Sequence, residues 1–500
     1  MTKPHLAIAA GNRLGCDAAE RVARMGGNAV DAALASGIMG WVAEPFFASL
    51  GGSGFVAVRV PGGAVEVIDG NNMMPVTLPR EAGQGMTRIF LPNYADGIYM
   101  GIGAGSVSVP GILAAVRTAW ERHGRIEWEA LFADAIAVAR DGFPFPKTSD
   151  YYLSCTWDEI WSRWETSHAL FSRDGLPLRE GDLLVQPELG DALEEIATKG
   201  SDVFYKGELG QDIADAIAAD DGFLGLDDLS AFEAEVRDPV ATHAFGWQIE
   251  SNPPPAVGGA VLAHMLALLD GTDLSDPVER LSAIVEAQRA AVGYRRDRYH
   301  DPTQIAAAFE EALQTLGSRV RGPESTTHTS AADADGYACS LTESNGYGSG
   351  LVARGIMLNN TLGEEELNPL GAHRLPPGSR TQSNMAPTIA SRGKDLAVAI
   401  GSPGADRIVG AITQTFLRIA VDGASLAEAV AGPRAHLDPR PEGETLCYEP
   451  GLPGDQLSFV QRPYDDIHMY FGAVQAAAVF SDGTVDAVHD PRRSGGSALV

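Results

Sequence analysis

The chain has 500 residues, of which 45% are hydrophobic and 21% are charged, a composition typical of folded globular proteins rather than disordered ones. Its 66 Asp and Glu against 37 Lys and Arg give a formal net charge of −29, which disfavours nucleic acid and anionic membrane surfaces as partners. The four cysteines are widely spaced and the histidines show no HExxH pattern, so a disulfide scaffold is excluded and we expect no metal and no cofactor.

The N-terminal region carries no targeting signal in the sequence as given. Its apolar run, Leu6 to Ala10, is shorter than the roughly 7–15 residues of a signal-peptide core. Elsewhere no stretch reaches the ~18 apolar residues of a membrane-spanning helix. We therefore expect a cytoplasmic protein, unless a mis-assigned start codon hides a leader.

Helical and strand patterns alternate along the chain. Residues 28–40 predict a helix capped by Asn28, and residues 129–140 predict another that ends at Asp141-Gly142. Residues 278–299 predict a third helix. Residues 54–60 and 396–400 are typical of strands. This interleaving favours α/β or α+β layering.

A predicted hairpin lies between Thr326 and Ser344. Asp335-Gly336 is a strong turn signal, and short strand-compatible side chains flank it. Strand ends at equal distances from a turn lie side by side, which places the hydroxyls of Thr326 and Ser344 within reach of each other.

Thr326 can act as a catalytic nucleophile only if it becomes the N-terminus of a chain. A threonine hydroxyl is a weak nucleophile at neutral pH and needs an adjacent base. Cleavage of the preceding peptide bond would create an α-amine with a pKa of about 7.7–8, which could take the hydroxyl proton directly or through one water. One residue would then supply nucleophile and base. The alternative is that Thr326 and Thr327 are simply β-branched strand residues.

A series of motifs in fixed order resembles the γ-glutamyltransferase (glutathione hydrolase) family of N-terminal-nucleophile hydrolases. Each motif alone is weak, but together and in this order they are specific. They are Gly26-Gly27-Asn28-Ala29-Val30-Asp31-Ala32-Ala33, Glu44-Pro45, Gly51-Gly52-Ser53-Gly54-Phe55, Ser108-Val109-Pro110-Gly111, Asp141-Gly142-Phe143-Pro144, Pro253-Pro254-Pro255, Gly258-Gly259, Thr326-Thr327-His328, Asp333-Ala334-Asp335-Gly336, Leu358-Asn359-Asn360, Met385-Ala386-Pro387-Thr388 and Gly401-Ser402-Pro403-Gly404.

The resemblance implies an α+β fold, a four-layer αββα sandwich, made as an inactive precursor. The precursor would cleave itself between Ser325 and Thr326 into a large chain, 1–325, and a small chain, 326–500. Both chains would form one intertwined unit, although the chain length alone predicts roughly three domains.

The resemblance also assigns catalytic roles. Thr326 matches the nucleophile. Ser344 stands where the family has a threonine whose hydroxyl bonds to the nucleophile. Gly404 and Ala405 match a Gly-Gly pair whose backbone N–H groups form the oxyanion hole, although alanine resists a positive φ. Asn345 matches a donor-binding asparagine in a loop that looks shorter here.

Substrate recognition departs further from the family pattern. Ser383-Asn384 replaces a Ser-Ser pair that holds a carboxylate, and Arg80 is the candidate arginine clamp. Glu364 falls where an acidic residue would meet the donor's amine. The short segment between Pro369 and Ser383 predicts that a lid loop, which covers the site in some members, is absent or reduced here.

The expected function is an autoprocessed amidohydrolase and acyltransferase. It would pass a γ-glutamyl or similar acyl group from a small-molecule amide to water or to an amine acceptor. Two alternatives stay open, namely an amidase for non-glutamyl amides such as acyl β-lactam side chains, and a non-catalytic relative that binds a small metabolite. A Ser-His-Asp hydrolase is disfavoured because no GxSxG elbow occurs, and His328 is assigned a structural role.

Overall fold

Two stacked sheets form the centre of the computed structural model, which describes residues 3–94, 97–298, 326–440 and 443–500. The first sheet has seven strands in the order β10 (Glu235–Arg237), β3 (Val65–Gly70), β2 (Ser53–Arg59), β14 (Ala338–Ser344), β13 (Thr327–Asp333), β1 (Leu6–Ala10) and β24 (Gly496–Leu499). The second has six, in the order β11 (Val240–Ala244), β12 (Trp247–Ser251), β17 (Thr388–Arg392), β18 (Leu396–Gly401), β22 (Gln475–Phe480) and β23 (Val485–Val488).

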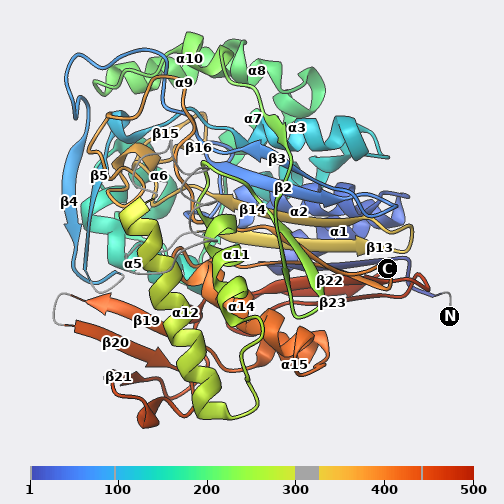
Figure 1. Ribbon diagram of the computed structural model, residues 1–500. Helices are drawn as coiled ribbons and strands as arrows, with labels where there is room; N and C mark the ends of the chain where they lie inside the picture. Colours follow the sequence, from blue (N-terminus) through green and yellow to red (C-terminus); the bar gives the residue numbers. More distant parts are fainter. Residues whose placement is uncertain (1–2, 95–96, 299–325, 441–442) are drawn as a thin grey trace.

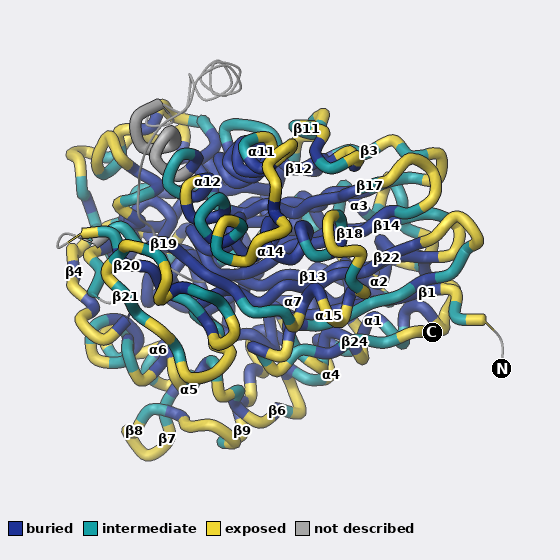
Figure 2. Tube along the Cα trace, turned by 60° about the horizontal axis from the view of Figure 1, so that its bottom comes forward, coloured by how far each residue is buried: buried dark blue, intermediate teal, exposed yellow. Residues whose placement is uncertain are grey.

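Helices cover the outer face of each sheet (Figure 1). On the seven-stranded sheet lie α1 (Arg13–Arg24), α2 (Ala29–Ala43) and α3 (Ile112–His123), and on the six-stranded sheet lie α11 (Gly258–Leu269) and α14 (Arg407–Ala420). This arrangement is the expected four-layer αββα sandwich. Figure 2 shows the buried strands of both sheets enclosed by partly exposed helices and loops.

The remaining elements surround this body. The other helices are α4 (Ala133–Asp141), α5 (Lys147–Thr156), α6 (Glu165–Phe171), α7 (Pro187–Lys199), α8 (Asp202–Tyr205), α9 (Glu208–Ala219), α10 (Leu226–Ser230), α12 (Pro277–Arg298) and α15 (Leu426–Ala431). The small sheets pair β4 (Thr87–Leu91) with β5 (Ile98–Ile102), β6 (Phe143–Pro144) with β9 (Leu183–Leu184), β7 (Ser172–Arg173) with β8 (Leu176–Pro177), β15 (Val352–Ala353) with β16 (Ile356–Met357), and β19 (Ala435–Arg440) with β20 (Gly443–Tyr448) and β21 (Val460–Pro463).

Several expected elements are present. Asn28 caps α2 through its side chain, which accepts from the backbone N–H groups of Val30 and Asp31. The single helix expected over 129–140 is instead a short 3₁₀ turn (Trp128–Leu131) followed by α4. The helix expected over 278–299 is α12, and Tyr299 lies outside the described residues.

The strand order interleaves the two halves of the sequence. β13 and β14, which follow residue 325, pair with each other and lie between β1 and β2, which precede it. Both proposed pieces of the chain therefore build one sheet. Among the residues that the structure describes, no helix has both the length and the apolar character needed to cross a membrane.

Candidate active site

Thr326 directly precedes β13, at one end of the predicted hairpin. The β13–β14 register pairs Thr327 with Glu343, so Thr326 stands opposite Ser344, and Gly336 has a φ of 98° in the turn. Thr326 is only 4% exposed, and both Thr326 and Ser344 line a common cleft. The hairpin prediction is confirmed, and it brings these two hydroxyl-bearing residues together.

Four further residues predicted from the sequence line the cleft. Glu364, Ser383, Asn384 and Ala405 line it, as does Gln382, which directly precedes Ser383. In the single chain its volume is about 30 Å³, enough to hold water.

The loop after β18 supplies the oxyanion-hole candidates. Gly404 has a φ of 124°, and Ala405 has a φ of 49°, so alanine does adopt the left-handed conformation here. The carbonyls of Gly404 and Ala405 accept from the N–H groups of Arg407 and Ile408 in the first turn of α14. Because a trans peptide opposes its N–H to its C=O, the Ala405 N–H points away from the Arg407 N–H that the Gly404 carbonyl accepts from.

Acidic and amide groups line the opposite wall of the cleft. Asn384 donates from Nδ2 to Glu366 Oε1 at 3.3 Å, and Ser383 Oγ accepts from the Met385 N–H at 3.2 Å. The Ser383 carbonyl accepts from the Val257 and Gly258 N–H groups, which fixes the Ser383–Asn384 segment against α11. Four further lining residues were not identified from the sequence, namely Glu366, Gln382, Asn71 and Thr361. The only sequence signal for some of these is that they lie close to Glu364 or Ser383 along the chain.

Glu364 is nearly buried in this wall. Burial raises the pKa of its carboxyl to about 8, since transfer from water penalises the charged form. At neutral pH it is therefore mostly protonated in the empty cleft. A cationic group placed beside it would favour ionisation, so the site can respond to a bound ammonium.

Two predicted substrate residues do not line this cleft. The Arg80 guanidinium is 71% exposed and pairs with Asp221, although the sequence suggested a carboxylate clamp. Asn345 is buried, and neither polar atom of its side chain has a hydrogen-bond partner among the described residues. Ser325, on the other side of the proposed cleavage point, lies outside the described residues.

Ionisable side chains lie close to Thr326 and to its neighbour Thr327. Arg493 donates from Nη1 to the Thr326 carbonyl at 3.0 Å. Glu44 accepts from the Thr327 hydroxyl, and burial raises the pKa of its carboxyl. Burial likewise raises the pKa of Glu343 to about 8, even though Trp41 Nε1 donates to its Oε1 at 2.9 Å. No motif in the sequence indicated Arg493, because its contact depends on a loop some 170 residues away from Thr326.

His328 is fully enclosed in β13. Its Nδ1 lies 2.8 Å from Thr342 Oγ1 and its Nε2 lies 2.9 Å from Ser330 Oγ. Burial lowers the pKa of the imidazole to about 3, so it stays neutral. These contacts support the structural role assigned to it.

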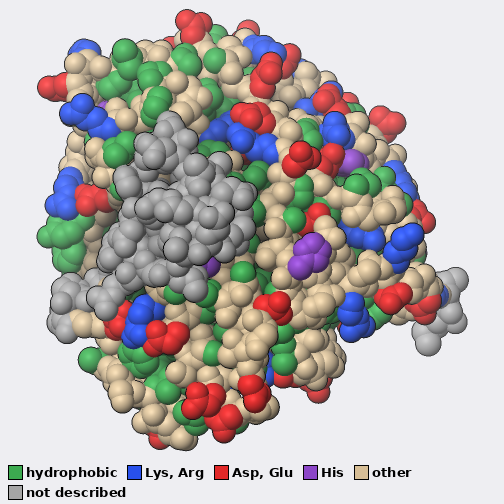
Figure 3. Space-filling model, in the orientation of Figure 1, with side chains coloured by type: hydrophobic (Ala, Val, Ile, Leu, Met, Phe, Trp, Pro, Cys, Tyr) green, Lys and Arg blue, Asp and Glu red, His purple; other side chains and the backbone are tan. Residues whose placement is uncertain are grey.

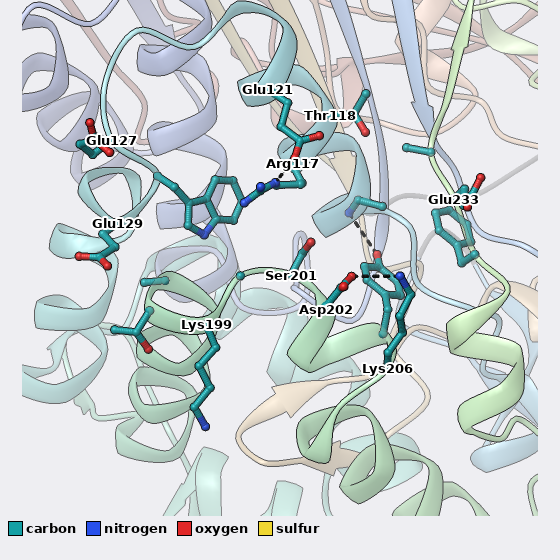
Figure 4. Close-up of a pocket in the computed structure, with 18 residues that line it drawn as sticks. Arg117, Thr118, Glu121, Glu127, Glu129, Lys199, Ser201, Asp202, Lys206 and Glu233 are labelled. Atoms are coloured by element: carbon teal, nitrogen blue, oxygen red, sulfur yellow. Dashed lines mark hydrogen bonds and ion pairs between the residues drawn. The ribbon is translucent and has the colours of Figure 1, made fainter.

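A larger hollow than this cleft lies over α3, α7 and α8 (Figure 4). It has a volume of about 810 Å³, and its charged side chains pair locally, as Arg117 does with Glu121 and Lys206 with Asp202. None of the residues predicted for acyl transfer lines it. On the face drawn in Figure 3, acidic and basic side chains are likewise interspersed. The residues of known position include no group of three or more His, Cys, Asp or Glu that could hold a metal ion.

Comparisons with known proteins show which family the chain is similar to. A family model described as gamma-glutamyltranspeptidase matches residues 15–322 and 306–500. The "Glutathione hydrolase 5 proenzyme" of Mus musculus is 30% identical over 549 residues, covering 98% of this chain and 91% of the relative. The "Glutathione hydrolase proenzyme" of Escherichia coli (strain K12) is 28% identical over 519 residues, covering 94% and 87%.

Solved structures share the fold. The cephalosporin acylase from Bacillus halodurans has a TM-score of 0.81 at 22% identity, covering all of this chain and 96% of the other. The family model spans nearly the whole sequence, including the residues that line the Thr326 cleft. The chain therefore belongs to the gamma-glutamyltranspeptidase family.

Proposed function

We propose that the chain is the precursor of an N-terminal-threonine amide hydrolase and acyltransferase. The observation that carries this proposal is the placement of Thr326, opposite Ser344 in the register of the hairpin and in one cleft with Ala405 and Glu364. The names of the relatives, which are proenzymes, support a precursor that is cut.

Maturation would be an intramolecular acyl transfer. The Thr326 hydroxyl attacks the Ser325 carbonyl, the C–N bond breaks, and the nitrogen becomes the α-amine of Thr326. Water then hydrolyses the resulting ester, which leaves a carboxylate on Ser325 and restores the Thr326 hydroxyl. The products are a large chain, 1–325, and a small chain, 326–500.

Turnover would repeat the same chemistry on a small-molecule amide. The α-amine accepts the hydroxyl proton while Oγ1 attacks the donor carbonyl, and the N–H groups of Gly404 and Ala405 stabilise the oxyanion. The resulting α-ammonium protonates the departing amine, which leaves an acyl ester on Thr326. Water or an amine acceptor then takes the acyl group.

The proposed donor is a γ-glutamyl amide. Glu364 and Glu366 would face its ammonium, and Ser383 and Asn384 would donate hydrogen bonds to its carboxylate. The relatives named glutathione hydrolases support this substrate class.

A second candidate is an amide whose acyl group lacks a carboxylate. In the described part of the chain, no lysine or arginine lines the cleft, and Arg80 is held on the surface by Asp221. An acidic cleft wall favours a cationic or neutral acyl group over an anionic one. A panel of γ-glutamyl anilides and non-glutamyl acyl anilides, with mass spectrometry of the small chain, would show which group is transferred.

Replacement of Thr326 tests the shared mechanism. Purified wild-type protein should give two bands on a denaturing gel, corresponding to residues 1–325 and 326–500, and should turn over at least one amide. Thr326→Ala should stay a single inactive chain. An active preparation that yields only the original N-terminus would refute the proposal, and a folded, uncut wild type that binds metabolites without turnover would favour the non-catalytic alternative.

A further inference from the structure

The loop between β23 and β24 carries Arg493 to the nucleophile. Besides its hydrogen bond to the Thr326 carbonyl, the guanidinium carbon lies 4.9 Å from the centre of the Phe47 ring. Arg493 Nε is buried, and no described residue accepts a hydrogen bond from it. The guanidinium thus donates one hydrogen bond to the main chain of Thr326, the proposed nucleophile.

A buried ion network fixes this loop. Asp490 pairs with Arg434 at 2.7 Å and with Arg492 at 3.1 Å, and Arg492 also pairs with Glu449. These four side chains are fully buried. Arg492, the residue just before Arg493, is fixed by its ion pairs with Asp490 and Glu449. The backbone that places the Arg493 guanidinium beside Thr326 therefore has little freedom to move.

The charge of Arg493 is not neutralised at contact distance. Within the described ranges no carboxylate forms an ion pair with it, and Glu44 interacts with it only at longer range. A positive charge beside an amine disfavours the ammonium form. The α-amine that cleavage would create belongs to the same residue whose carbonyl Arg493 contacts.

We propose that Arg493 is a positioning residue for the mature nucleophile: it fixes the Thr326 main chain, and its charge favours the unprotonated α-amine that serves as base. The inference rests on the proposed function, since the amine exists only after cleavage. It explains how a terminal amine can act as a base at a pH near its ordinary pKa of about 7.7–8.

Several carboxyl groups face the same region and oppose this effect when ionised. Glu44 lies at the end of α2 and Glu343 lies on β14, while Glu364 and Glu366 belong to the facing cleft wall. Asp406, in the oxyanion loop, is paired with Arg407. Burial raises the pKa values of Glu343 and Glu364 to about 8, so both carboxyls are mostly uncharged at neutral pH, and burial also raises the pKa of Glu44, which the Arg493 charge opposes.

The expected effect appears in the pH profile. A unit charge about 6 Å from the amine, at an effective dielectric constant of about 40, shifts its pKa by about one unit. Arg493→Gln and Arg493→Met should therefore move the acidic limb of kcat/KM upward by about one pH unit, because that limb reports the free enzyme's base. Arg493→Lys keeps the charge and should leave the limb in place, even if the rate falls.

The matched control is Arg24→Gln, which removes an arginine that pairs with Glu20 on the exposed side of α1. Self-cleavage of each variant is checked first on a denaturing gel, and kcat/KM is then measured from pH 5 to pH 9. A rate that falls by one factor at every pH, with the limb unmoved in Arg493→Gln and Arg493→Met, would overturn the proposal. So would failure of Arg493→Gln and Arg493→Met to cleave while Arg493→Lys cleaves, because the charge would then act in the precursor and not on the mature amine. Failure of the proposed function would instead appear in the wild type, as an uncut chain or one without turnover.

Discussion

Substitution of Ala405 tests the oxyanion hole through the backbone. Its φ of 49° lies in the left-handed region, which costs an L-residue about 1–2 kcal/mol and is a genuine outlier for a β-branched side chain. Ala405→Val should therefore drive the loop out of this conformation and turn the Ala405 N–H from the cleft. Loss of one such donor lowers kcat by roughly 10²–10³-fold, or about 3–4 kcal/mol. Ala405→Gly should keep the donor, because glycine adopts a positive φ without a steric penalty.

The assay is steady-state hydrolysis of a chromogenic anilide by fully cleaved protein. Valine should lower kcat, whereas a change in KM alone would indicate that its side chain only obstructs the cleft. The reasoning is refuted if valine leaves kcat within about threefold of wild type, or if glycine lowers kcat as much as valine does.

Three further predictions concern carboxyl and hydroxyl groups at the site. Glu343 keeps its proton up to pH 8 or so in the folded chain but loses it near 4.5 when unfolded, so its contribution to stability is complete below pH 4.5 and falls as pH rises toward 8. Relative to Glu343→Gln, wild type should lose about 3 kcal/mol of unfolding free energy between pH 5 and pH 7, measured by denaturant titration; parallel curves would contradict this. For donors with an ammonium group, KM should fall as pH rises through about 8, where Glu364 ionises. Glu364→Gln should abolish this pH dependence of KM. If the dependence persists in the variant, Glu364 does not bind the ammonium group. Ser344→Ala should lower kcat about tenfold and Ser344→Thr should restore it, as expected for one lost hydrogen bond; equal activity of all three forms would exclude a role for the hydroxyl.

Local signals made the hairpin and its ends predictable. Asp335-Gly336 marked the turn, and counting outward from it placed Thr326 near Ser344. The exact register, which is centred on Asp335, comes from the structure. Asn28 likewise marked the start of α2. The ordered motifs then indicated the sandwich that surrounds the hairpin.

Contacts between distant loops could not be predicted in the same way. Arg80 follows a motif at the expected spacing, yet Asp221 holds its guanidinium at the surface, and spacing carries no information about that ion pair. Arg493 has no sequence signal, since its position depends on buried charges contributed by several elements. For Ala405 the sequence indicated strain, but only the folded loop shows that alanine adopts the required conformation.

The place of β13 and β14 in the sheet has a consequence for refolding. Each hydrogen-bonds on its outer side to a strand from before residue 325, so cutting the chain at the proposed point would create two chain ends without removing these strand pairings. Once unfolded, however, the two polypeptides would have to find each other before their central strands could pair again. Recovery from denaturant should therefore become concentration-dependent after the cut, whereas an uncut Thr326→Ala chain should recover at a rate independent of dilution.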